Sequence, residues 1–98
     1  MVTIQHSGPH DLTLETDRYA YGNRLAVFAV ENGEDFATLS VNIPEEPLSD
    51  GEFAFKTYSE NEGLIEQFVA AGLIEFTGRY TRWPLGLPIC RLTDLSKA

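Results

Sequence analysis

Carboxylates are the side chains of this sequence whose number and spacing could do chemistry. The stretch IPEEPLSDGEF, residues 43–53, places Glu45, Glu46, Asp50 and Glu52 on one turn-rich segment without a basic residue among them. Paired carboxylates can act as general acid and base where a pocket shifts their pKa values. Nothing in the surrounding pattern indicates such a pocket, so we interpret these carboxylates as a charged surface and expect no catalysis.

Other residues with chemical potential are few. His6 and His10 have a spacing that could hold zinc on a helix, but the Gly-Pro pair between them disfavours a helix, and we assign residues 1–10 to a flexible N-terminus. Cys90 has no histidine nearby in sequence to act as its base, so it is predicted to be a buried strand cysteine. No phosphate-binding or nucleophile-elbow motif is present. We therefore expect a non-enzymatic protein with no metal and no cofactor.

The acidic residues are concentrated in the middle of the chain. The net charge is −8, and residues 31–75 hold eleven acids and one lysine, whereas residues 76–98 hold one acid and four bases. Direct binding to nucleic acid or to an anionic membrane is disfavoured, because either would need Lys and Arg. A basic protein surface is the partner that this charge suits. The candidate partner-binding residues are Glu31, Glu34, Asp35, Glu45, Glu46, Asp50, Glu52, Glu60 and Glu62. A second interpretation is that the acidic surface is kept for solubility.

A strand pattern precedes and surrounds a predicted hairpin. Leu12, Leu14 and Thr16 alternate with polar residues, which indicates a half-buried strand. Runs at about 24–31 and 36–43 flank the sequence ENGED, whose Asn-Gly pair tolerates the positive φ angles of a hairpin turn. We predict that the core face of this hairpin carries Ala26, Phe28, Val30, Ala37, Leu39, Val41 and Ile43.

One helix is predicted at about 60–71. Ser59 and Glu62 have the spacing of a capping box, and Gly72 suits the left-handed position after a helix. The apolar residues Leu64, Ile65, Phe68 and Val69 recur at helical spacing and form one stripe.

The remaining segments read as strands, which gives the fold class. GEFAFKTY is one strand, and residues 74–80 and 89–92 form two more, joined by a Pro/Gly corner. The order of elements predicts a single α+β domain over residues 1–98, with a mainly antiparallel sheet of about 5–6 strands and one amphipathic helix packed on one face. Within GRYTRWPLG, we expect the arginines to pair with nearby acids and Trp83 to close the core edge; stacking on single-stranded nucleic acid is the alternative. One cysteine fits a reducing cytoplasm, and no apolar run is long enough to span a membrane. We expect a monomer.

About half of the chain carries a family resemblance. The strand ATLSVNIP (37–44), the acidic loop that ends this strand (residues 44–52) and the segment EQFVAAGLIEFTG (66–78) resemble a family of small acidic proteins of bacterial plasmids, phages and conjugative elements. That family is similar to small anti-CRISPR proteins that block DNA binding by type I surveillance complexes, type I-C among them. The resemblance implies an inhibitor that occupies the basic DNA-binding surface of a Cas subunit in the bacterial cytoplasm by mimicking nucleic acid. The alternative is a non-enzymatic accessory protein of a phage or plasmid. The proline-rich end departs from the family pattern, so the resemblance assigns no role to residues 79–92.

Overall fold

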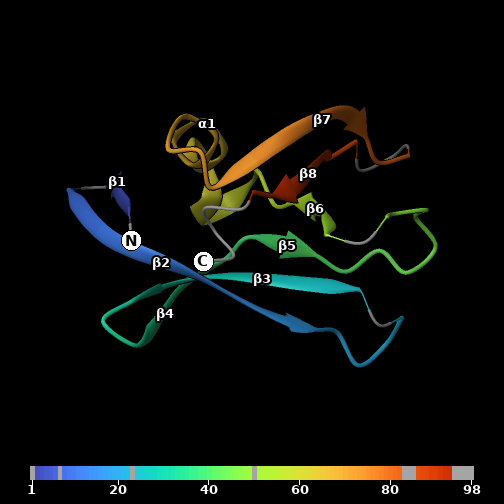
Figure 1. The fold of residues 1–98 in the computed structure, drawn as a ribbon, viewed down its shortest axis with the longest axis horizontal. Helices are drawn as coiled ribbons and strands as arrows, with labels where there is room; N and C mark the ends of the chain where they lie inside the picture. Colours follow the sequence, from blue (N-terminus) through green and yellow to red (C-terminus); the bar gives the residue numbers. More distant parts are fainter. Residues whose placement is uncertain (1, 7, 23, 50, 83–85, 94–98) are drawn as a thin grey trace.

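The computed structural model describes residues 2–6, 8–22, 24–49, 51–82 and 86–93. In this part of the chain eight strands form two antiparallel sheets of four strands each, with the orders β1-β2-β3-β4 and β5-β6-β8-β7 (Figure 1). The strands are β1 Val2–Gln5, β2 Pro9–Arg18, β3 Leu25–Glu31, β4 Glu34–Thr38, β5 Ser40–Val41, β6 Glu52–Phe55, β7 Ile74–Tyr80 and β8 Pro88–Leu92, and the helices are the 3-10 turn η1 Ser59–Asn61 and the α-helix α1 Leu64–Ala70. The α+β class with mainly antiparallel sheets is confirmed, with more strands than the 5–6 predicted.

The two sheets are connected by one continuous path of chain and by the helix. Strands β4 and β5 are separated only by Leu39, whose N–H donates to the carbonyl oxygen of Val27 at 2.9 Å, so the chain passes from the first sheet to the second without leaving β3. Helix α1 contacts both β1 and β7, each the outer strand of its sheet (Figure 1). The helix therefore fills the opening between the two sheets.

The core lies between the two sheets and α1. Fully buried side chains from both sheets meet the inner face of the helix, because each sheet has one apolar face that must be covered. The buried cluster consists of Ile4, Leu12, Val27, Ala29, Ala37, Leu39, Phe53, Phe55, Leu64, Phe68, Ile74, Cys90 and Leu92. No helix in the described part of the chain has the length and apolar character needed to span a bilayer.

The predicted hairpin turn is present, and Ala37 and Leu39 lie in the core as predicted, but the face predicted for β3 is wrong. Asn32 and Gly33 have φ angles of 52° and 79°, as a two-residue turn with two positive φ angles requires. A β-bulge then shifts the register, so that Ala37 pairs with Ala29 and not with Phe28. As a result Val27 and Ala29 face the core, whereas the predicted set of Ala26, Phe28 and Val30 lies on the opposite face.

The prediction of a flexible N-terminus over 1–10 is also wrong for the residues described. Strand β1 pairs with β2 from Val2↔Leu12 to Gln5↔Pro9, and Ile4 is fully buried. The physical reason is visible in the sequence, since Val2 and Ile4 alternate with polar residues as in a half-buried strand.

The helix is shorter than the predicted 60–71. Ser59 has a φ of 60° and makes no side-chain capping bond, and Gly63, with a φ of 84°, separates η1 from α1. The predicted capping box is therefore wrong. Ser59 and Glu62 belong to η1 and its C-terminal cap, and Gly63 separates them from the apolar stripe of α1. Gly72, with a φ of 79°, ends the helix in the left-handed conformation as predicted.

Candidate acidic binding surface

Glu46 of the acidic loop is turned into the protein. Its side chain is only 8% exposed, and its Oε1 accepts a hydrogen bond from the backbone N–H of Arg82 at 3.0 Å. The guanidinium of Arg82 contributes a second contact, with Nε 3.8 Å from the same oxygen, and it also donates to the carbonyl oxygen of Glu45 at 2.8 Å. Glu46 therefore attaches the loop to the chain after β7 and is not presented to a partner.

Glu52, at the start of β6, is also neutralised inside the protein. It forms an ion pair with Arg79, and its Oε1 accepts a hydrogen bond from the N–H of Ser49 at 2.9 Å. The hydrogen bond from Arg79 and that from Ser49 hold the pKa of Glu52 below its ordinary value of 4.5. Together with Glu46 and Arg82, this pair confirms the prediction that the arginines after residue 78 meet nearby acids.

A third arginine lies beneath the same loop. Arg24 donates through Nη2 to the carbonyl oxygens of Pro44, at 2.9 Å, and Glu46, at 2.5 Å. Its Nη1 lies 3.5 Å from the carbonyl oxygen of Leu48. Although no basic residue is present in the loop sequence, three arginines from other segments surround the loop. Much of its negative charge is therefore compensated within the fold.

The other predicted carboxylates are dispersed. Glu31 meets Nδ1 of His10 at 3.0 Å, while Nε2 of the same ring lies 3.0 Å from the carbonyl oxygen of His6. This arrangement makes both histidines part of the folded N-terminal hairpin. Four predicted carboxylates are exposed to solvent: Glu34 and Asp35 on β4, Glu45 in the loop, and Glu62 after η1. Asp50, the side chain of Glu60, and Trp83 lie outside the described residues.

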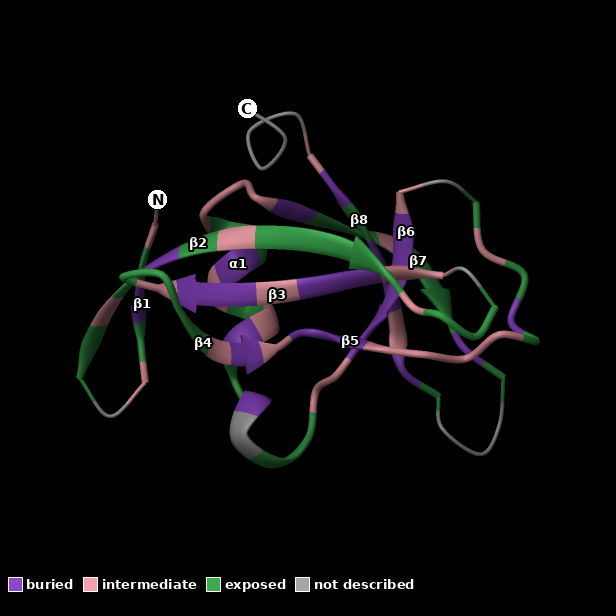
Figure 2. Ribbon diagram, turned by 90° about the horizontal axis from the view of Figure 1, so that it is seen from below, coloured by how far each residue is buried: buried purple, intermediate pink, exposed green. Residues whose placement is uncertain are grey.

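An acidic face of which the sequence prediction named only Asp35 lies on the outer side of the first sheet. Exposed Glu15 and Asp17 project from β2, and Glu15 pairs across the sheet with Phe28 of β3. These three residues, together with Thr16 and Asp35, line a shallow hollow of about 230 Å³. Figure 2 views the molecule from this side and shows that the second half of β2 is exposed. We call Glu15, Asp17 and Asp35 the acidic face.

The carboxylates of the acidic face are not neutralised as those of the loop are. Among the described residues, Glu15, Asp17 and Asp35 form no ion pair, and the one hydrogen bond to them comes from the backbone N–H of Arg18 to Oδ1 of Asp17, at 2.8 Å. Alternation along β2 could have indicated Glu15 and Asp17 as a charged strand face. The position of Asp35 on the same side also needs the pairing of β2 with β3, in which Val30 lies between Thr13 and Asp35.

The described part of the chain holds neither a metal-binding group nor a reactive cysteine. It contains no group of three His, Cys, Asp or Glu side chains placed to hold a metal ion. Cys90 is fully buried, as predicted, and burial raises the pKa of its thiol to about 12. A thiol in this state is protonated at neutral pH and is a poor nucleophile.

Comparison with known proteins finds no matching family model, and no curated protein or solved structure matches the chain either. The proposals below therefore depend on the residues and on the resemblance described for residues 37–78.

Proposed function

We propose that the protein is a non-enzymatic inhibitor whose acidic face occupies a basic, nucleic-acid-binding surface of another protein. The resemblance described above makes the partner a Cas subunit of a type I CRISPR surveillance complex, and the protein an anti-CRISPR protein that competes with DNA. The observation that carries the proposal is the set of carboxylates at Glu15, Asp17 and Asp35, which are exposed and lack an ion pair among the described residues.

The spacing of these carboxylates supports nucleic-acid mimicry. Glu15 and Asp17 are two residues apart on one strand, a rise of about 6.6 Å. One strand of a DNA duplex carries a phosphate about every 3.4 Å of axis, so the two carboxylates match about two phosphate steps. Asp35, from β4, adds a third charge across the hollow. The overall charge of −8 would also steer a basic partner toward the protein before contact.

A displacement assay tests the proposal. A labelled target DNA is bound to a purified type I surveillance complex, and the native chain is titrated until the DNA is released. The double variant Glu15→Gln/Asp17→Asn should weaken displacement by about tenfold or more, because it removes two charges from the contact surface. The matched control Glu45→Gln/Glu62→Gln removes the same net charge from exposed positions elsewhere and should change displacement by less than about threefold. Equal weakening by the two double variants would show that only net charge matters and would contradict the proposal.

One observation favours the second candidate, an accessory protein with an acidic surface kept for solubility. The exposed acids Glu34, Glu45 and Glu62 are dispersed over β4, the acidic loop and the segment after η1, as charges kept for solubility would be. The same two double variants distinguish the candidates. If both lower solubility near neutral pH and neither changes the recovery of Cas proteins from a CRISPR-bearing host, the accessory role is favoured.

A further inference from the structure

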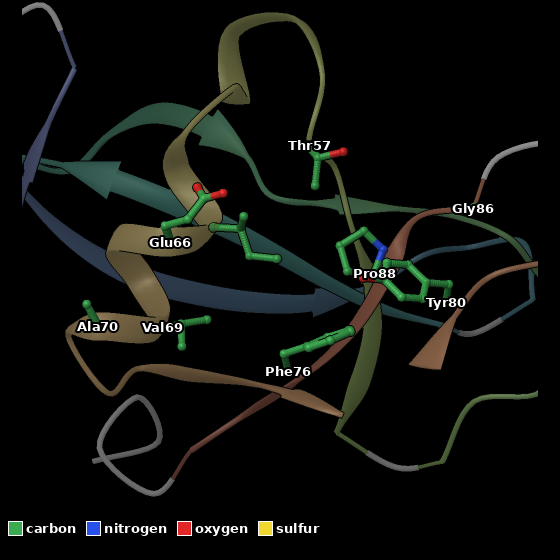
Figure 3. Close-up of a pocket in the computed structure, with 9 residues that line it drawn as sticks. Thr57, Glu66, Val69, Ala70, Phe76, Tyr80, Gly86 and Pro88 are labelled. Carbon is green, nitrogen blue, oxygen red and sulfur yellow. The ribbon is translucent and has the colours of Figure 1, made fainter. Parts of the chain in front are cut away.

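An apolar groove lies between helix α1 and the hairpin of β7 and β8 (Figure 3). In Figure 1, α1 and β7 lie on the opposite side of the molecule from β2 and β4, which carry the acidic face. It has a volume of about 660 Å³, and its walls include Ile65, Glu66, Val69, Phe76, Tyr80 and Pro88. The rings of Phe76 and Tyr80 are in edge-to-face contact, with their centroids 5.3 Å apart. Phe76 is 41% and Tyr80 62% exposed, so two adjacent aromatic side chains face solvent on a small, highly charged protein.

The shortness of α1 explains why the groove is open. A helix of seven residues is about 10 Å long, which is too short to cover the whole inner side of β7. The predicted apolar stripe is divided in two: Leu64 and Phe68 are fully buried, whereas Val69 is 39% exposed at the groove. The groove is thus an uncovered extension of the core face, since Phe76 pairs with buried Cys90 across the sheet.

One carboxylate at the groove lacks a counter-charge in the described part of the chain. Glu66 is exposed and forms no ion pair there, and no Lys or Arg is among the described residues that line the groove. The neighbouring arginines of this sheet are already paired, Arg79 with Glu52 and Arg91 with Glu75. The groove therefore offers apolar contact with a negative charge beside it.

We infer that this groove binds an aromatic or aliphatic side chain from a basic segment of the partner protein, and that Glu66 pairs with a Lys or Arg of that segment. The inference rests on the proposed function and deepens it: the acidic face supplies long-range attraction, and the groove supplies a buried apolar anchor of the kind that dominates interface energy. Apolar patches of this kind on small soluble proteins mark interaction sites.

A second copy of the chain suits the groove less well. Two copies carrying a charge of −8 each would repel one another. In a symmetric dimer formed through this groove, the two Glu66 carboxylates would also be brought close together without a counter-charge among the described lining residues.

Two synthetic peptides of about twelve residues provide the probe. One contains phenylalanine and leucine between lysines, and the other has the same lysines with serine in place of each apolar residue. Binding to the full chain is measured by fluorescence anisotropy, and the contact residues are located by amide chemical shifts. The apolar peptide should bind at least about tenfold more tightly than the serine peptide and shift the amides of Val69, Phe76 and Tyr80.

Variants with matched controls sharpen the test. Tyr80→Ala should weaken the apolar peptide by about tenfold, whereas Tyr21→Ala, which removes a 76% exposed tyrosine outside the groove, should leave it unchanged. Val69→Ser removes an apolar side chain from the α1 side of the groove and should weaken the apolar peptide as Tyr80→Ala does. Glu66→Gln should weaken binding of both peptides, and Glu62→Gln should weaken neither by more than about twofold. Urea midpoints confirm that each variant is folded.

Three outcomes would overturn the inference: equal binding of the two peptides, equal effects of the two tyrosine substitutions, or a dimer in sedimentation that Tyr80→Ala dissociates. The result is separable from the proposed function. If Tyr80 is needed for peptide binding but Glu15→Gln/Asp17→Asn still displaces DNA normally, the proposed role of the acidic face is wrong and the proposed role of the groove is supported. If DNA displacement depends on the acidic face and both peptides bind alike, the groove is wrong and the acidic face stands.

Discussion

Oε1 of Glu46 accepts a hydrogen bond from the backbone N–H of Arg82 at 3.0 Å, although the two residues are 36 positions apart in the sequence. This one contact changes the role of the acidic loop. In the sequence, the Glu46 carboxylate looks like part of a charged surface. In the structure, it accepts a hydrogen bond from the backbone of the segment that follows β7. The loop is fixed by its acids, and the exposed acids of the molecule lie mainly elsewhere.

The first prediction concerns the stability that Glu46 provides. Glu46→Ala leaves the Arg82 N–H without its partner, so the free energy of unfolding should fall by about 1–3 kcal/mol. Glu46→Gln keeps an acceptor oxygen and should cost less than Glu46→Ala. Urea unfolding followed by circular dichroism measures both. Glu45→Ala, on the exposed neighbour, serves as control and should change stability by less than about 0.5 kcal/mol; equal losses at positions 45 and 46 would disprove the structural role.

The second prediction is a pH dependence carried by Glu52. Its folded-state pKa is lowered below 4.5 by the hydrogen bonds from Arg79 and Ser49, so ionised Glu52 stabilises the fold. This contribution is complete above the unfolded-state pKa and is lost as the pH falls through the lower, folded-state pKa. At pH 7 Glu52→Gln should lower the free energy of unfolding by about 1–3 kcal/mol, and the difference from the native chain should shrink below about pH 4.5.

Unfolding in urea across the range from neutral to acidic pH measures this difference. The control is Glu75→Gln, because the Glu75–Arg91 pair is about half exposed on both sides and should contribute no more than about 1 kcal/mol. A constant difference between Glu52→Gln and the native chain at all pH values would show that the ionised carboxylate is not what stabilises the loop.

The third prediction concerns the connection between α1 and β1. The side-chain amide of Gln67 makes two hydrogen bonds with the backbone of Gln5, accepting from its N–H at 2.7 Å and donating to its carbonyl oxygen at 2.8 Å. Gln67→Ala should cost about 1 kcal/mol and accelerate hydrogen exchange of the Gln5 amide. Gln67→Glu keeps the acceptor oxygen and should protect the Gln5 amide from exchange better than Gln67→Ala does. Glu66→Ala, on the same helix, should leave the exchange of Gln5 unchanged, and faster exchange there would argue for general loosening of the helix.

The fourth prediction is that Cys90 is inert in the folded protein. With its pKa raised to about 12, the thiolate fraction at pH 8 is about one in ten thousand, and the side chain is fully buried. Ellman's reagent should therefore react only as fast as the protein opens, and reaction should become rapid above the urea midpoint. Rapid labelling of the native chain at pH 8 would mean that the strand β8 is accessible without unfolding.

Local preferences carried much of the fold prediction. The turn at Asn32-Gly33 and the helix end at Gly72 were predictable because each depends on positive φ angles at one or two residues that tolerate them. Alternation correctly placed Leu12 and Leu14 on the inner side of β2 but not Thr16, which is exposed. The break at Gly63 was not predicted, because the spacing of Ser59 and Glu62 favoured one continuous helix from residue 60. The bulge near Phe36 was not predictable, because the local sequence fits both a regular and a bulged strand and only packing chooses between them.

The candidate site depended more than the fold did on contacts between residues that are far apart in the sequence. The sequence by itself determined that the protein is acidic, that its acids cluster in residues 31–75 and that its arginines are few. Only the tertiary structure decided which acids remain unpaired, since Arg24, Arg79 and Arg82 reach the loop from distant segments while Glu15 and Asp17 meet no arginine side chain in the described chain. The physical reason is that the presentation of a carboxylate depends on the neighbours within a few ångströms, and folding brings those neighbours from anywhere in the sequence.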